Sequence, residues 1–230
     1  MPRTARIVLP GYLHHVTQRG NYKQFVFEED TDRVNYLHLM QKYSVKHQLD
    51  IFAYCLMPNH VHFIVRPQQK SSMAETFCRV HQIYSSYFHG KKGIKGHLWQ
   101  ERFYSCVLHE DHIRNAVRYV ERNPVRARMV YRPWEYTWST ARAHLGKEYK
   151  LIQLADIKEY IDVSSWEGYL AGEERDDDLK LIRQATFKGN VLGPEEFLKS
   201  LEDKLKRKII PRPNGRPKTS DRHNYLPPTS

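Results

Sequence analysis

The run that decides the fold of this chain reads LMPNHVHFIV and extends from Leu56 to Val65. Successive side chains of a strand point to opposite faces, so His60 and His62 share one face while the apolar residues beside them face a core. Two neutral imidazoles on one face supply half of a metal site, which needs at least one more ligand from elsewhere in the fold. Two half-exposed histidines at a strand edge are the ordinary alternative.

Hydrophobic patterning on both sides of this run predicts an α+β domain. Strands are expected at residues 11–17, 51–57, 60–66 and 103–108, and helices at 30–47, 72–88 and 111–123. The resulting order, βαββαβα, is that of the ferredoxin-like, or RRM-like, split βαβ pattern. We therefore expect an antiparallel sheet with helices on one face, the other face being free for a site.

The segment from Asp111 to Pro124 predicts a short amphipathic helix. Its apolar residues recur at helical spacing, Asp111 suits an N-cap, and Pro124 favours a helix end at the preceding residue. Tyr119 and Asn123 lie one turn apart on the flank of the apolar stripe, where a phenol and an amide can supply a nucleophile and a metal ligand. A boundary tyrosine followed by a capping asparagine is the alternative. The arginines of the helix fall on more solvent-facing parts of its surface: Arg114, Arg118 and Arg122.

Together, these segments resemble the HUH superfamily of single-tyrosine transposases, and most closely the REP-associated tyrosine transposases and their insertion-sequence relatives. The matching stretches cover about residues 5–142 in family order: PGYLHHVTQRGN at 10–21, MPNHVH at 57–62, LWQERF at 98–103 and YVERNPV at 119–125. The resemblance implies that His60 and His62 bind a metal, that Tyr119 is the nucleophile and that Asn123 completes the metal site. Where the family usually continues with a basic residue, a small residue and Gly, this chain has Arg126-Ala127-Arg128, which affects the turn after the helix.

The resemblance further implies metal-dependent nicking and strand transfer of single-stranded DNA at hairpin-associated, REP-like repeats, through a 5′-phosphotyrosine. A phenol is a poor nucleophile at neutral pH and a phosphodiester repels anions, so a divalent ion beside the tyrosine suits this chemistry. A nitrogen and oxygen site with few protein ligands favours Mg²⁺ or Mn²⁺. Two alternatives remain open: a metal phosphodiesterase in which the histidines activate water, and a repeat-DNA-binding module without turnover.

Composition agrees with a nucleic-acid partner. Lys and Arg number 37 against 26 Asp and Glu, which gives a formal net charge of +11 and favours binding to polyanions. The sequence has no apolar run of 18 residues and no signal-like N-terminus, so we expect no membrane anchor and a bacterial cytoplasmic location, associated with the nucleoid through DNA. Cys55, Cys78 and Cys106 form no C-x-x-C pair and are expected to be reduced core thiols. Either a monomer or a homodimer is compatible with the sequence.

Basic and aromatic residues near the predicted strands are candidate DNA contacts. The loop at 90–100, GKKGIKGHLWQ, combines glycines, lysines and a tryptophan, and a polar turn follows the first strand. Lysines bind phosphates and aromatic rings stack on unpaired bases. A solvated loop with its tryptophan in the core is the alternative. The candidates are Arg19, Lys91, Lys92, Lys95, Trp99 and Arg102.

Beyond residue 142 the family motifs become sparse. We expect a catalytic domain at 1–142, a helical extension at 143–206 and a basic, Pro-rich, disordered tail at 207–230. The extension either helps to grip DNA or only caps the core, and the acidic run at 173–178 is expected to be a solvated helix start or linker. The tail contains Gly-Arg-Pro, the core of an AT-hook, in which Arg216 would enter the minor groove of A·T-rich duplex.

Overall fold

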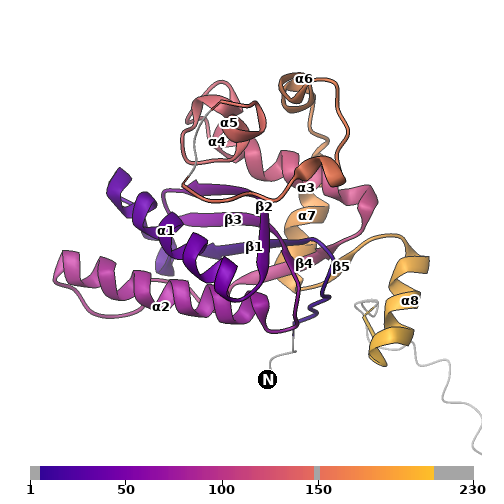
Figure 1. The fold of residues 1–230 in the computed structure, drawn as a ribbon, viewed down its shortest axis with the longest axis horizontal. Helices are drawn as coiled ribbons and strands as arrows, with labels where there is room; N and C mark the ends of the chain where they lie inside the picture. Colours follow the sequence, from indigo (N-terminus) through magenta and orange to yellow (C-terminus); the bar gives the residue numbers. More distant parts are fainter. Residues whose placement is uncertain (1–5, 148–150, 210–230) are drawn as a thin grey trace, which may run out of the picture.

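A five-stranded sheet organises the computed structural model, which describes residues 6–147 and 151–209 (Figure 1). In space the strands lie in the order β2-β3-β1-β4-β5, with the first four paired antiparallel and β5 parallel to β4. This confirms the predicted α+β class and the split βαβ order, whereas the sequence pattern did not predict β5. The strands are β1 His14–Arg19, β2 Leu49–Met57, β3 His60–Pro67, β4 Tyr104–Leu108 and β5 Val191–Leu192.

One face of the sheet is covered by α1 (Asp30–Lys46) and α2 (Ser72–Lys92), which lie side by side (Figure 1). Phe63 of β3 points to this side, where its ring lies 6.3 Å from that of Tyr36 and 5.6 Å from that of Phe77. All three side chains are fully buried. The apolar face of β3 therefore forms the core that the alternation in its sequence predicted.

The end of α2 is fastened to the start of α1, and α2 continues to Lys92 rather than ending at residue 88 as predicted. The ammonium of Lys91 lies 2.9 Å from the carboxylate of Asp32, which is fully buried, and 3.0 Å from that of Glu29. Lys92 pairs with Glu28 at 2.5 Å. Both lysines thus belong to a helix end held by ion pairs, not to the loop in which the sequence had placed them.

The opposite face of the sheet carries α3 (Glu110–Glu121) and α7 (Asp176–Lys188). His62 points to this side and contacts α3, and His15 of β1 is hydrogen-bonded to Thr186 of α7. The expectation that helices cover only one face is therefore wrong. Both helices are amphipathic and bury their apolar stripes against the sheet, so this face of the sheet is not left free.

The extension expected at 143–206 packs into the same hydrophobic core as the strands. It contains α6 (Trp166–Ala171), α7, β5 and α8 (Glu195–Leu205), so it is mainly helical as predicted, with β5 as an unpredicted addition. The remaining short elements are η1 Asn21–Lys23, α4 Asn123–Arg126, η2 Pro133–Glu135, α5 Ala141–His144 and η3 Ile157–Glu159. The residues of the extension that lie in the same core as the strands are Ile152, Ile157, Ile161, Trp166, Tyr169, Leu170, Ile182, Ala185 and Leu192.

A buried carboxylate ties the C-terminal end of α3 to the segment that follows it. Glu121 is fully buried and accepts hydrogen bonds from the hydroxyl of Thr140 at 2.6 Å, Nδ1 of His144 at 2.6 Å and Nε1 of Trp166 at 2.9 Å. A buried carboxylate is tolerated only when such donors compensate its lost hydration. Glu121 therefore fixes the helix that carries Tyr119.

The acidic run at 173–178 confirms the predicted helix start, because Asp176, Asp177 and Asp178 form the first turn of α7, whereas Glu174 is not solvated as expected and has a structural role. Glu174, with a side chain 9% exposed, accepts from Arg122 at 3.0 Å and from Arg126 at 2.7 Å. Arg122 also donates to the backbone carbonyl of Leu170. Arg122 is therefore not solvent-facing as predicted, because the extension folds back over this side of α3 and covers it.

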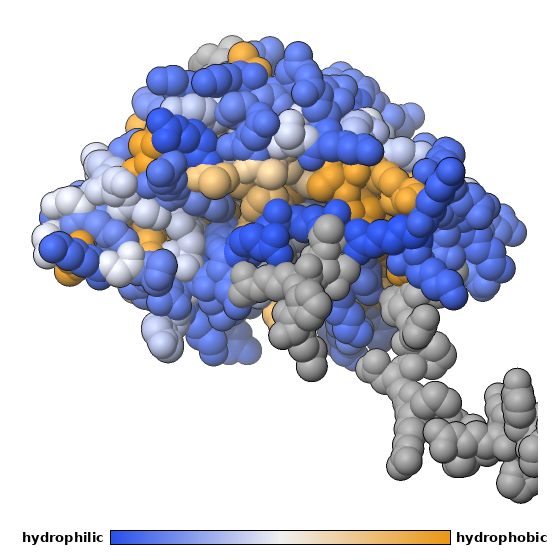
Figure 2. Space-filling view, turned by 90° about the horizontal axis from the view of Figure 1, so that it is seen from below, coloured by the Kyte–Doolittle hydropathy of each residue, from blue (hydrophilic) through white to orange (hydrophobic). Residues whose placement is uncertain are grey.

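Apolar side chains are sparse on the face seen in Figure 2, where they form a band between hydrophilic residues. Within the described residues, no helix is both long and apolar enough to cross a membrane.

All three cysteines are free, and Cys55 and Cys106 are buried as predicted. Cys78 is exposed on α2, which corrects its assignment to the core. Arg216 and the AT-hook motif lie outside the described residues.

Two histidines predict acid sensitivity, namely His14, which is fully buried, and His81, which is partly buried against Tyr36 and Trp99. Burial lowers the pKa of His14 to about 4 and that of His81 to about 3. Well above pH 6.5 both rings are neutral in the folded and the unfolded chain, so neither affects stability. As the pH falls below 6.5, these histidines become protonated in the unfolded chain but stay neutral in the folded chain. The free energy of unfolding should therefore fall by about 3 kcal/mol per ring by pH 4. Urea unfolding at pH 7.5, 5.5 and 4.5 measures this loss; an unchanged free energy of unfolding would contradict it.

Candidate functional site

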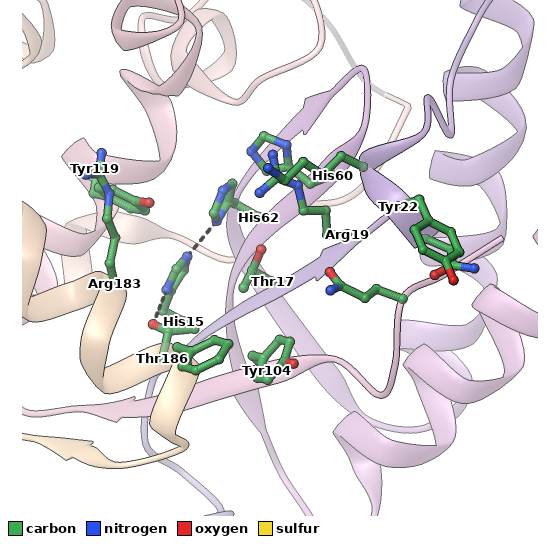
Figure 3. Close-up of a pocket in the computed structure, with 14 residues that line it drawn as sticks. His15, Thr17, Arg19, Tyr22, His60, His62, Tyr104, Tyr119, Arg183 and Thr186 are labelled. Atoms are coloured by element: carbon green, nitrogen blue, oxygen red, sulfur yellow. Dashed lines mark hydrogen bonds between the residues drawn. The ribbon is translucent and has the colours of Figure 1, made fainter. Parts of the chain in front are cut away.

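A pocket of about 980 Å³ opens on the sheet face beside α3 and α7 and extends to Tyr22 of η1 (Figure 3). Strands β1, β3 and β4 form its floor, and both helices contribute to its walls. Its most informative lining residues are His15, Arg19, His60, His62, Tyr119 and Arg183. The structure therefore brings together two segments, the histidine strand and the tyrosine helix, that the sequence singled out separately.

The turn between β2 and β3 sets the position of the two histidines. Met57 pairs with His60 across a link of two residues, which places His62 opposite Cys55 on β2 and opposite Thr17 on β1. Because the side-chain period of a strand is two, this register turns both imidazoles to the pocket. Their ring centroids lie 4.9 Å apart, with the planes at 85°.

Both imidazoles use Nδ1 for a hydrogen bond within the protein. Nδ1 of His60 lies 2.6 Å from Oδ1 of Asn59, and Nδ1 of His62 lies 2.9 Å from Nε2 of His15. Ligand histidines in proteins are commonly oriented in this way through their second ring nitrogen. The Nε2 atoms are therefore the nitrogens that remain for a ligand.

Burial keeps these rings neutral. It lowers the pKa of His60 to about 4 and that of His62 well below its ordinary value, and the positive charge of Arg126 lowers both further. The pKa of His15 is lowered by burial, and secondarily by Arg126, to about 3. Only a neutral imidazole has a lone pair to offer a metal ion. The pocket therefore holds its histidines in the state that metal binding requires.

Tyr119 lies edge-on to the histidines, with its hydroxyl end directed toward His62 in Figure 3. Its ring centroid is 5.5 Å from that of His62 and 5.6 Å from that of His15. The guanidinium groups of Arg126 and Arg183 lie 4.3 and 5.8 Å from its ring centroid. Positive charge thus surrounds the phenol, in an arrangement that favours an approaching phosphate.

Asn123 begins α4, one turn beyond Tyr119, and does not line the pocket. Its Nδ2 is buried and has no hydrogen-bond partner within the described residues. A half-turn of the amide would exchange this nitrogen with the oxygen, the atom that a metal would bind. Within the same residues, no three or more His, Cys, Asp or Glu side chains form a metal-binding group. An ion held here would complete its coordination with water or substrate oxygens.

The candidate DNA contacts occupy different environments. Arg19 lines the pocket, whereas a phosphate would have to displace Asp32 or Glu29 from Lys91. Trp99 is partly buried, with its ring centroid 4.5 Å from that of His81, which agrees with the alternative that it packs against the core. Trp99 and Arg102 also line a second pocket, of about 1010 Å³, beside α2. Lys95 is exposed in the loop after α2, and Lys92 is paired with Glu28.

Sequence reasoning missed several residues that line the pocket, namely His15 of β1, Tyr22 and Lys23 of η1, and Arg183, Thr186 and Phe187 of α7. Alternation along β1 was a usable signal for His15, because it shares a face with Thr17 and Arg19. Helix α7 offered no comparable signal. Its three pocket residues come from the extension, whose arrangement over β4 arises only through long-range packing.

Comparison with known proteins bears on the family and the fold of this chain. The family model described as "Transposase IS200 like" matches residues 10–123, a span that includes β1, the histidine strand, Tyr119 and Asn123. Among solved structures, the chain is similar to a REP-associated tyrosine transposase bound to a REP hairpin. The TM-score is 0.50 with 23% sequence identity, and the match covers 76% of this chain and 99% of that one. At this identity the structural likeness shows a shared fold. Curated protein sequences gave no significant match.

Proposed function

Because the chain belongs to the family of IS200-like transposases, we propose that it nicks and rejoins single-stranded DNA at hairpin-associated repeats, with Tyr119 as the nucleophile. The observation that carries this proposal is the contact between the rings of Tyr119 and His62, inside a pocket also lined by Arg183. A nucleophile, neutral metal-ligand side chains and positive charge converging on one pocket suit attack on a phosphodiester.

In the proposed reaction the phenol oxygen of Tyr119 bonds to phosphorus while the bond from phosphorus to the 3′-oxygen breaks. The phenol loses one proton and the departing 3′-oxygen gains one, so the products are a 5′-phosphotyrosine and a free 3′-hydroxyl. One phosphodiester replaces another of similar energy, and a second 3′-hydroxyl can therefore reverse the step and join new strands without ATP. Arg183, which lines the pocket, places positive charge beside the phosphate, while Arg126, paired with Glu174, packs against the ring of Tyr119.

The residues present fit a divalent ion, which we propose to be Mg²⁺ or Mn²⁺ held by His60, His62 and the amide of Asn123. Two neutral imidazoles and an amide oxygen, without a thiolate, form a donor set suited to these ions. When bound, such an ion would withdraw charge from a non-bridging phosphate oxygen. The hydrogen bonds that Nδ1 of His60 and Nδ1 of His62 donate to Asn59 and His15 keep the two rings oriented for this role.

Single-stranded hairpin DNA is the proposed substrate, and two observations support it. A protein of similar fold was solved with a REP hairpin, and this chain carries a net charge of +11. Action on such DNA would place the protein with the nucleoid of a bacterial cytoplasm. We propose that it acts there as a monomer or a homodimer. We propose that residues 1–142 supply the nucleophile and the metal ligands, that Arg19, Lys95, Trp99 and Arg102 contact the DNA, and that Arg216 in the tail contacts duplex DNA.

An aromatic pair beside the pocket predicts stacking on an unpaired base. Phe187 is 70% exposed and lies 5.1 Å from the ring of Tyr104 at an interplanar angle of 25°, and both residues line the pocket. Phe187→Ala should weaken hairpin binding by roughly tenfold, because stacking of one base is worth about 1–3 kcal/mol. Fluorescence anisotropy with a labelled hairpin measures this. Phe25→Ala removes an exposed phenylalanine outside the pocket and should leave the affinity unchanged; equal losses in both variants would contradict a specific stacking site.

Covalent capture tests the proposed function. The protein is incubated with Mn²⁺ or Mg²⁺ and labelled single-stranded hairpins from repeats beside its own gene, and denaturing gels are examined for a protein–DNA adduct. We expect an adduct that disappears in His60→Ala or when EDTA is added. Cleavage without an adduct would favour the water-activating phosphodiesterase, and binding without cleavage would favour the repeat-binding module.

A further inference from the structure

Consecutive hydrogen bonds join three buried side chains, from Thr186 of the extension through His15 to the proposed metal ligand His62 (Figure 3). Nδ1 of His62 lies 2.9 Å from Nε2 of His15, and Nδ1 of His15 lies 2.7 Å from Oγ1 of Thr186. The Thr186 hydroxyl lies 2.7 Å from the carbonyl oxygen of Ile182, one turn earlier in α7. All three side chains are at most 5% exposed, so water does not compete for these bonds.

The carbonyl at the end of this chain gives every bond in it a direction. A carbonyl oxygen only accepts, so the Thr186 hydroxyl donates its single proton to Ile182. The hydroxyl oxygen must then accept from Nδ1–H of His15. A neutral imidazole has one N–H, which leaves Nε2 of His15 as an acceptor and makes Nδ1 of His62 the donor. Nε2 of His62 is thereby left with its lone pair.

We propose that Thr186 and His15 are positioning residues, through which α7 of the C-terminal extension sets the tautomer of His62 that binds the metal. The reverse direction would put a proton on Nε2 of His62 and block coordination. This inference rests on the proposed function, since it assigns His62 a metal. It gives the extension, whose family motifs are sparse, a defined part in the catalytic centre.

The rings are also arranged to keep this order. The rings of His15 and His62 lie edge to edge with their planes 7° apart and their centroids 5.1 Å apart, the geometry of an in-plane hydrogen bond, and the ring of Tyr119 is nearly perpendicular to both. Cys106 lies 3.2 Å from Oγ1 of Thr186 and can donate its thiol proton there, which leaves the direction of the other bonds unchanged. An oriented partner of a ligand histidine typically changes metal affinity by about 10- to 100-fold when it is removed.

The test compares tautomers and metal affinity in the full chain without DNA. Long-range ¹H–¹⁵N NMR of the metal-free wild type should show His15 and His62 both protonated at Nδ1. Mn²⁺ binding, followed by electron paramagnetic resonance of the free ion at pH 7.5, should weaken about tenfold or more in His15→Leu and about threefold to tenfold in Thr186→Val. Thr186→Ser keeps the hydroxyl and should restore the affinity, and Cys106→Ala should retain it. Melting temperatures identify variants that fail to fold.

Protonation of His62 at Nε2 in the wild type would overturn the inference, as would equal Mn²⁺ affinity in Thr186→Val and the wild type. Loss of Mn²⁺ binding in Cys106→Ala as large as in Thr186→Val would do the same, because it would indicate a general packing effect. Absence of Mn²⁺ binding by the wild type would instead count against the proposed metal centre. In that case the tautomers of His15 and His62 still decide whether the directed hydrogen bonds exist.

Discussion

Tyr119→Phe should abolish the covalent protein–DNA adduct and lower hairpin cleavage by about 10⁴-fold or more, the scale seen when an enzyme loses its nucleophile. The substitution removes only the hydroxyl. The ring contacts with His62 and His15 and the position of the ring beside Arg126 are retained. Hairpin affinity should therefore stay within about threefold of the wild type. Denaturing gels measure the adduct and anisotropy measures binding, with the same labelled hairpin.

A second tyrosine of the pocket provides the matched control for this loss. Tyr22 lines the same pocket and is 95% exposed, but it lies on η1, away from α3. Tyr22→Phe should form the adduct at the wild-type rate. An adduct that persists in Tyr119→Phe would mean that another side chain attacks the phosphate. Cleavage that persists there without an adduct would identify water as the nucleophile and Tyr119 as structural.

Glu121→Ala should lower the free energy of unfolding by about 3–5 kcal/mol, because it leaves three buried donors without their acceptor. These donors belong to Thr140, His144 and Trp166, which follow α3 in the chain. For a chain of this size the loss corresponds to a fall in melting temperature of roughly 10 °C. Urea denaturation followed by tryptophan fluorescence and circular dichroism measures it.

Glu121→Gln and Glu167→Ala make this prediction specific. The glutamine keeps one acceptor oxygen and the side-chain shape, so it should lose less than the alanine variant. Glu167 is an exposed glutamate on α6, next to Trp166, and its replacement should change stability by less than about 0.5 kcal/mol. A Glu121→Ala protein within 1 kcal/mol of the wild type would show that the carboxylate does not hold α3 in place.

Local patterns predicted the strands and helices in which apolar side chains recur at a regular spacing. The alternation around His60 and His62 predicted β3 and the side to which both rings point, and the helical spacing from Asp111 predicted α3 with Tyr119 on its flank. The ends of elements were less predictable. Helix α2 runs on to Lys92 because Lys91 finds Asp32 on α1, a partner 59 positions away in the sequence. Such a contact leaves no trace in a window of a few residues.

By itself, the sequence determined the α+β class and the order of the first four strands, because strand and helix periods are local properties of the chain. The residues proposed for the chemistry followed from those patterns together with the motifs that the chain shares with its family. Only the tertiary structure decided that the extension reaches the pocket, adds β5 to the sheet and sets His15 between His62 and Thr186. The bond from His15 to Thr186 joins residues 171 positions apart. Hydrogen-bond partners at such a separation meet only after the core has packed, and packing depends on shape and volume across the whole domain, which no local pattern encodes.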